Sequence, residues 1–200
     1  MSKELDAARE LVKMLDEKEK ASKVELSTLK PGETFKMVGR EFIVLKHGHI
    51  QSGCTAVICK GLWDKSVKFG DNRNYIKSNV KKIMDKVADE IETEVGADNL
   101  IKHEVSLTSV DMQNEFGSCE CKVRPLTFDE AREFNDLIVN KDLPDWWWTC
   151  TPWSTGERGY TYSIAVVSPR GSIYFYGCNN CNGVRPVCIL KSNIFVSKGK

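Results

Sequence analysis

Two pairs of closely spaced cysteines are the residues in this chain whose spacing could hold a metal ion. Cys119 and Cys121 are one residue apart, and Cys178 and Cys181 are two residues apart in a stretch rich in Gly and Asn. Four thiolates can bind a structural zinc ion, and a CxxC pair can instead form a reversible disulfide. The spacings are imperfect for zinc, and several predicted elements separate the two pairs. We therefore favour unrelated thiols and predict no cofactor.

The remaining reactive side chains do not indicate catalysis. The histidines His47, His49 and His103 lie far upstream of the aromatic C-terminal third. No spacing typical of a Ser-His-Asp triad or of paired carboxylates is evident. The C-terminal region also has few carboxylates that could form the oxygen cage of a calcium site. We expect a protein that is not an enzyme.

The stretch from Asp145 to Leu190 has the composition of a binding surface. It holds four of the five tryptophans and four of the five tyrosines, and it has hardly any acidic residue after Glu157. Tyr offers a large, rigid contact area, while Ser, Gly and Asn offer adaptable hydrogen bonds, which is the mixture found in evolved paratopes. The alternative is that two or more of the tyrosines are core residues, because aromatic side chains favour strands in general.

The tryptophans of this stretch admit two interpretations. Three consecutive tryptophans on a strand, Trp146 to Trp148, must point to alternating faces. One or two of them are expected to anchor the core, and we assign Trp146 and Trp148 to the scaffold. The alternative for this group is stacking on a sugar ring or another flat ligand, and Trp153 is assigned to the binding surface.

The apolar pattern predicts an α+β fold in which two helices pack on short antiparallel strands. Alternating apolar residues predict a hairpin near Thr34–Leu45, a strand at Ala56–Cys59 and a short strand at Glu104–Leu107. Helices are expected from about Ser78 to Val95 and from Thr127, where Thr127 and Glu130 form a capping box. The last third is expected to hold a hairpin of Tyr160–Val167 with Ser172–Tyr176, and a final strand at Gly183–Leu190.

Residues 1–25 are predicted to form a separate amphipathic helix ahead of a domain of residues 26–200. Leu5, Ala8, Val12 and Leu15 recur at spacings of three and four. A lone helix of this length is marginal in water, so it should pack on something. It either docks onto the domain or forms a short coiled coil that makes the protein a homo-oligomer.

The overall charge argues against nucleic acid and membrane as partners. Lys and Arg total 29 against 28 for Asp and Glu, so the formal net charge is +1. No long run of one sign and no apolar stretch of membrane-spanning length occurs. The charged N-terminus lacks the pattern of a secretory signal, so we expect the chain to be cytoplasmic when made, with virion association as a further expectation.

Three motifs carry a resemblance to a known family: Trp146-Trp147-Trp148, Thr151-Pro152-Trp153 and Gly183-Val184-Arg185-Pro186-Val187. With them the chain resembles C-type-lectin-fold domains of bacteria and phages, in the branch that contains variable proteins of diversity-generating retroelements. Formylglycine-generating enzymes share this fold. The resemblance implies that the tryptophans enter a core strand, that the Gly183–Val187 run closes against it, and that Arg185 ties loop carbonyls or a carboxylate together.

The resemblance also implies a function and a set of contact residues. Such proteins diversify solvent-facing positions just before the GVRP run, and the chain would be a phage- or prophage-encoded binding protein for a protein or glycan on a cell surface or particle. The matching candidates, to which composition adds Trp153, are Tyr160, Tyr162, Ser163, Ser172, Tyr174, Tyr176, Asn179, Asn180 and Asn182. The alternatives are an intracellular structural or interaction module without a variable face, and a cysteine-based metal-binding protein or oxidase.

Overall fold

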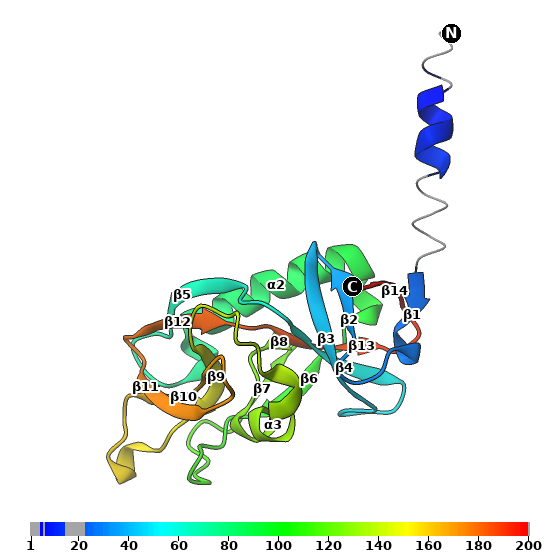
Figure 1. The fold of residues 1–200 in the computed structure, drawn as a ribbon. Coiled ribbons are helices and arrows are strands. Elements are labelled where there is room, and N and C mark those ends of the chain that lie inside the picture. The colour runs from blue at the N-terminus through cyan, green and yellow to red at the C-terminus, as the bar shows by residue number, and fades with distance from the viewer. Residues whose placement is uncertain (1–4, 6, 15–22, 200) are drawn as a thin grey trace.

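The computed structural model describes Leu5, residues 7–14 and residues 23–199. These residues form an α+β fold with mostly antiparallel sheets, as the sequence predicted (Figure 1). Two larger sheets and one small sheet make up the body, and its first strand, β1 (Lys23–Glu25), pairs with its last, β14 (Phe195–Lys198).

The larger sheet has seven strands in the order β1-β14-β2-β3-β4-β13-β8. Its remaining strands are β2 (Thr34–Met37), β3 (Arg40–His47), β4 (Cys54–Cys59), β13 (Val187–Lys191) and β8 (Val123–Arg124). β2 and β3 form the predicted hairpin, and Gly39 takes a φ of 69° in its turn, a conformation that glycine adopts without strain.

The second sheet has five strands in the order β11-β10-β9-β12-β5 and carries the aromatic C-terminal third. These strands are β11 (Ile173–Gly177), β10 (Ser163–Val167), β9 (Trp147–Pro152), β12 (Cys181–Val184) and β5 (Asp64–Lys68). A small third sheet pairs β6 (His103–Ser106) with β7 (Ser118–Cys121).

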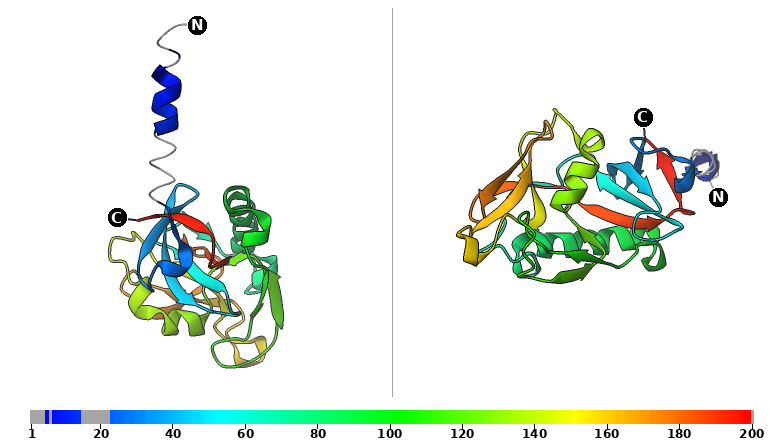
Figure 2. Two further views of the ribbon diagram at one scale, coloured as in Figure 1. Left: turned by 90° about the vertical axis from the view of Figure 1, so that its right-hand side faces the viewer. Right: turned by 90° about the horizontal axis from the view of Figure 1, so that it is seen from below.

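The long helix α2 (Asn79–Val95) and the short helices α3 (Phe128–Glu133) and α4 (Asn135–Ile138) lie on opposite sides of the body (Figure 2). α2 begins at Ser78, whose side chain accepts from the Lys81 amide, and ends at Gly96, as the apolar stripe predicted. α3 begins with the predicted capping box of Thr127 and Glu130, and α4 follows it. Short 3-10 turns complete the helical segments: η1 (Leu26–Thr28), η2 (Tyr75–Lys77), η3 (Ala97–Asn99) and η4 (Gly156–Arg158).

β9 lies between two separate hydrophobic cores, and all six of its residues are buried. Trp148 packs into the core that α2 covers, and its indole N–H donates to the Val67 carbonyl at 2.7 Å. Trp147 points the other way, into the core that α3 and α4 cover. The strand alternation expected from the sequence is therefore confirmed for this pair.

The prediction of one final strand at Gly183–Leu190 is wrong. The run divides into β12 and β13, which belong to different sheets, and β14 follows them. The break falls at Arg185 and Pro186. The buried Arg185 guanidinium donates to the Cys59 carbonyl at 3.0 Å and to the Ile138 carbonyl at 2.7 Å, and proline has no N–H for a ladder.

A buried ionic network holds α3 against the seven-stranded sheet. Arg124 binds the Glu130 carboxylate through two hydrogen bonds of 2.5 and 2.6 Å and donates to His103 Nε2 at 3.0 Å. His49 contacts Glu130 Oε1 at 3.0 Å. Burial and the neighbouring Arg124 lower the pKa of His103 to about 4, so this imidazole is neutral at pH 7.

The described part of the N-terminal segment, Leu5 and residues 7–14, is helical. Its apolar side chains are exposed, with Leu11 at 54% and Val12 at 58%. Leu15 and the rest of the predicted stripe lie outside the described residues. No helix among the described residues has the length and apolar character needed to cross a membrane.

Removing Glu130 should destabilise the fold strongly. Glu130→Gln would leave the Arg124 guanidinium buried without its counter-charge, a loss of about 3–5 kcal/mol in the free energy of unfolding. Urea denaturation would measure it. Glu133→Gln on the same helix is the matched control, because its ion pair with Lys46 is largely exposed and should contribute less than about 1 kcal/mol. Equal losses for the two variants would contradict this account.

The N-terminal helix should oligomerise the protein. Light scattering after size-exclusion chromatography should show an oligomer for the full chain and a monomer for a chain lacking residues 1–21, which keeps β1 and its pairing with β14. A monomer in both cases would refute self-association through this segment.

Candidate binding surface

Six aromatic rings form one connected and partly exposed group, here called the aromatic cluster: Trp146, Trp153, Tyr160, Tyr174, Phe175 and Tyr176. Phe175 lies at its centre, with ring centroids 4.8 Å from Trp153, 5.6 Å from Tyr160 and 4.7 Å from Tyr174. Tyr176 joins Tyr174 to Trp146 at 6.2 and 5.6 Å. Each ring therefore fixes the orientation of a neighbour.

Two strands position the cluster. β11 is an edge strand, so Tyr174, Phe175 and Tyr176 lie at the border of the sheet rather than under another layer. Trp146 and Trp153 flank the two ends of β9, whose interior is anchored in both cores. Trp146 and Trp153 are thus held beside a strand that is buried along its whole length.

A second group of predicted contact residues lies beside the turn between β11 and β12. Asn179 and Asn180 are exposed in this turn, and Tyr162 holds it from the neighbouring loop, since its carbonyl accepts from the Cys178 amide at 2.8 Å. A Cβ at Gly177 would come within 2.9 Å of Asn179 Oδ1, so the exposed Asn179 side chain packs closely against this glycine. Ser172 is exposed at the other end of β11, and Ser163 is half-buried.

Asn182 is not solvent-facing and is a correction to the predicted contact set. It is 3% exposed because β12 is an inner strand, where Asn182 pairs with Val67 of β5. Its position near the GVRP run suggested exposure, but strand order within the sheet decides burial.

The expected strand at Tyr160–Val167 begins only at Ser163, so two of the four tyrosines lie outside it. Tyr160 and Tyr162 belong to a loop after η4, so strand alternation does not set their directions. They are nevertheless exposed, at 48% and 38%. On β11 the expected parity holds: Tyr174 and Tyr176 face the same side as Val166 and Ile164, their partners on β10.

The sequence missed two members of the aromatic cluster. Phe175 was not a candidate, although it makes the largest number of ring contacts, and Trp146 was assigned to the scaffold alone. Trp146 is half-buried and packs on the α2 core while its ring contacts Tyr176. Phe175 lies between Tyr174 and Tyr176 on β11, so strand alternation places it on the opposite face from the two tyrosines, and it was not predicted.

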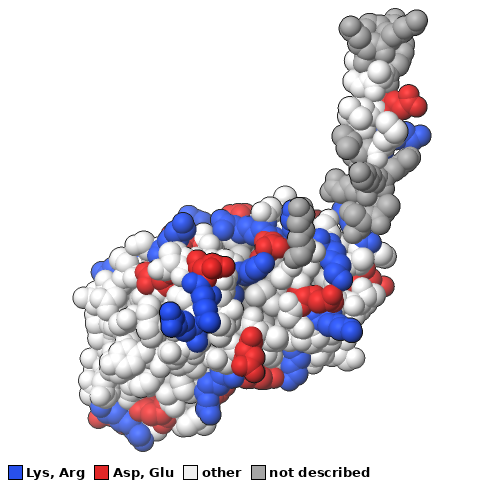
Figure 3. Space-filling model, viewed as in Figure 1, with Lys and Arg blue, Asp and Glu red and all other residues white. Residues whose placement is uncertain are grey.

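The surface around the cluster carries few charges. Between Gly159 and Val184 the only charged residue is Arg170. In Figure 3 the end of the molecule over β10, β11 and β12 is accordingly mostly white, whereas the opposite part of the body is dense with both signs. Depletion of charge together with Tyr and Trp is typical of the centre of protein interfaces.

The cysteine pairs do not come together as a metal site. All eight cysteines are free, and the described residues hold no group of three or more His, Cys, Asp or Glu side chains that could hold a metal ion. Cys178 is buried while Cys181 is exposed. Burial raises the pKa of Cys178 and of Cys121 to about 11, so both thiols are protonated at pH 7.

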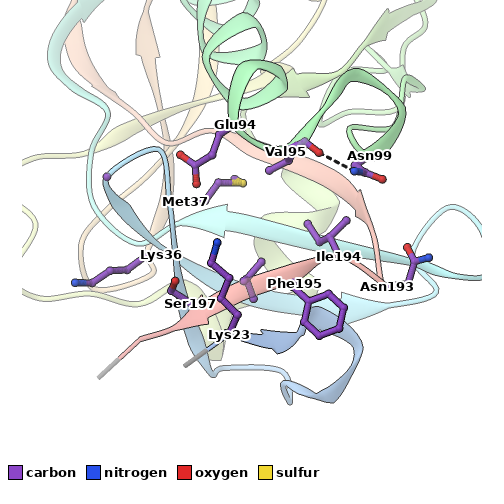
Figure 4. Close-up of a pocket in the computed structure, with 12 residues that line it drawn as sticks. Lys23, Lys36, Met37, Glu94, Val95, Asn99, Asn193, Ile194, Phe195 and Ser197 are labelled. Carbon is purple, nitrogen blue, oxygen red and sulfur yellow. Dashed lines mark hydrogen bonds between the residues drawn. The ribbon is translucent and has the colours of Figure 1, made fainter. Parts of the chain in front are cut away.

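A pocket of about 500 Å³ lies away from the aromatic cluster, between the end of α2 and strands β2 and β14 (Figure 4). Lys23, Glu94 and Asn99 contribute polar groups to it, and Phe195, 67% exposed, lies at its side. The Glu94 carboxylate is already bound by the Val38 amide at 2.6 Å. None of the predicted contact residues lines this pocket.

No family model, curated protein or solved structure matches this chain.

The exposed tyrosines should contribute little to folding. Tyr174→Ala should lower the free energy of unfolding by less than about 1 kcal/mol, because the side chain is 51% exposed. Trp148→Ala, the buried control, should lose about 3–5 kcal/mol. Urea denaturation compares the two, and a loss above about 2 kcal/mol for Tyr174→Ala would show that this tyrosine is a structural residue.

Proposed function

We propose that this chain is a ligand-binding protein of the receptor-recognition type, encoded by a phage or prophage. Its aromatic cluster and the neighbouring Tyr162, Asn179 and Asn180 would contact a protein or glycan on a cell surface or particle. The observation that carries the proposal is the aromatic cluster itself: six connected, partly exposed rings on the edge strand β11, beside the two ends of the buried strand β9 and in the loop before β10, in a segment with few charged residues.

An exposed aromatic surface is unfavourable in water and favours binding to a partner that covers it. Monomeric proteins rarely expose large contiguous apolar patches without a partner. Tyr and Trp lose little rotamer entropy on binding, and here each ring is already held by a neighbour, so less ordering remains for the complex. Asn179, Asn180 and Ser172 add hydrogen-bonding groups beside the rings.

We assign the domain to the C-type-lectin-like fold. Two contacts support the proposal: Gly183 of β12 lies beside Trp147 of β9, and Arg185 donates to the carbonyls that end β4 and α4. Residues 160–180 then take the place of the diversified positions in retroelement variable proteins. The N-terminal helix would multimerise the domain and add avidity to a modest single-site affinity.

Two experiments test the proposal. The purified chain would be screened against glycans and surface proteins of host bacteria, and any hit would be repeated with Tyr160→Ser and Tyr174→Ser. Each variant should weaken binding by about tenfold or more if these rings are central contacts. Lys82→Ser, an exposed change on α2, is the control and should bind as the parent does.

The gene neighbourhood gives an independent test of diversification. A reverse transcriptase gene and an adenine-rich repeat matching the codons of residues 160–182 should lie close by.

In the binding experiment, a ligand that still binds both Tyr160→Ser and Tyr174→Ser would show that the aromatic cluster is not the contact surface.

A further inference from the structure

A pocket of about 530 Å³ lies near the aromatic cluster, and because Glu115 and Glu157 line it, it is called the acidic pocket here. Two loops form it: the loop between β6 and β7, and the segment around η4, which lie side by side in Figures 1 and 2. Trp153 and Tyr160 flank the second loop in the sequence, so both lie close to the pocket without lining it. Its lining residues are Gln113, Asn114, Glu115, Thr155, Gly156 and Glu157.

The walls of the acidic pocket are fixed by contacts within the chain. The Arg73 guanidinium, in a residue 5% exposed, donates to the Ser154 carbonyl at 2.9 Å, to the Thr161 carbonyl at 2.5 Å and to Glu115 Oε2. Asp111 bridges the same loops, accepting from Ser154 Oγ at 2.6 Å. The pocket is therefore preformed, which lowers the entropy cost of binding.

The lining is rich in unused hydrogen-bond acceptors. Both the Arg73 contact and the Gly156 amide go to Glu115 Oε2, which leaves Oε1 without a partner among the described residues. The ion pairs nearby join Arg73 to Glu115 and Arg158 to Asp111, and neither involves the exposed Glu157. Thr155 is 7% exposed, and its Oγ1 has no hydrogen-bond partner.

No Lys or Arg lines the acidic pocket, so its charge favours a cation. Glu115 and Glu157 carry two negative charges, and only the Arg73 behind Glu115 offsets one of them. A guanidinium offers five donors in a planar fork, which suits carboxylate oxygens on two walls. A single carbonyl or hydroxyl ligand would leave most of these acceptors unused.

From these observations we propose that the acidic pocket binds an arginine side chain of the protein partner whose apolar residues cover the aromatic cluster. This inference rests on the proposed function and names the partner as a protein with an arginine beside an apolar surface. Arg is enriched at the energetic centres of interfaces, and the rings would exclude water from the rim of the ion pair.

The test uses the full chain labelled with ¹⁵N and the probe N-acetyl-arginine amide. Saturable NMR shifts are expected at the amides of Gln113, Asn114 and Gly156, and they should weaken as NaCl is added. The neutral isostere N-acetyl-citrulline amide should bind at least about tenfold more weakly, because it lacks the charge.

Glu157→Gln should weaken the arginine probe by about three- to tenfold without changing the melting temperature, since Glu157 is exposed. Glu90→Gln, at an exposed position on α2, is the matched control and should leave the affinity unchanged. Citrulline binding as well as arginine, or an unchanged affinity in Glu157→Gln, would overturn the inference. If Tyr174→Ser still abolishes binding of a partner in that case, only the arginine assignment fails and the proposed function stands.

Discussion

The strand β9 is buried on both faces, and the two hydrophobic cores pack against it from opposite sides. Successive side chains of a strand point to opposite faces, so Trp147 and Trp148 must enter two different cores. Each indole buries a large apolar area, and together they fix the strand from both sides. The residues just outside the strand, Trp146 and Trp153, are therefore held in place although they are only partly buried.

Buried arginines hold loops and the ends of helices and strands in place through their hydrogen bonds. Arg185 joins the end of β4 to the end of α4, Arg124 joins β8 to α3, and Arg73 joins the two loops of the acidic pocket. Burying a guanidinium is costly unless its donors are used. Burial lowers the pKa of Arg185 to about 10, yet the group remains charged at pH 7 and lies 4.6 Å from the centre of the Trp147 ring.

Under the proposed function, the buried strand and the buried arginines would make a binding surface of loops and an edge strand specific. The aromatic cluster supplies apolar area with little conformational freedom left, and the acidic pocket supplies charge beside it. An interface with a rigid aromatic centre and one desolvated ion pair gains affinity from the rings and orientation from the charge. The low charge of the remaining surface leaves the pocket as the main electrostatic feature at this end of the molecule (Figure 3).

Several helices and strands could be predicted from the sequence alone. Local signals sufficed for the hairpin at Gly39, for α2 between Ser78 and Gly96 and for the capping box at Thr127, because each depends on residues near in the chain. Of the four tyrosines in residues 145–190, Tyr160, Tyr162 and Tyr174 are exposed, and Tyr176 is half-buried against the core. Three features could be seen only in the tertiary structure. Asn182 is buried, and Phe175 lies at the centre of the aromatic cluster. Residues 113–115 and residues 155–157 line the same pocket. Strand order and loop contacts join residues that are distant in the chain, and no local pattern encodes which of them will meet.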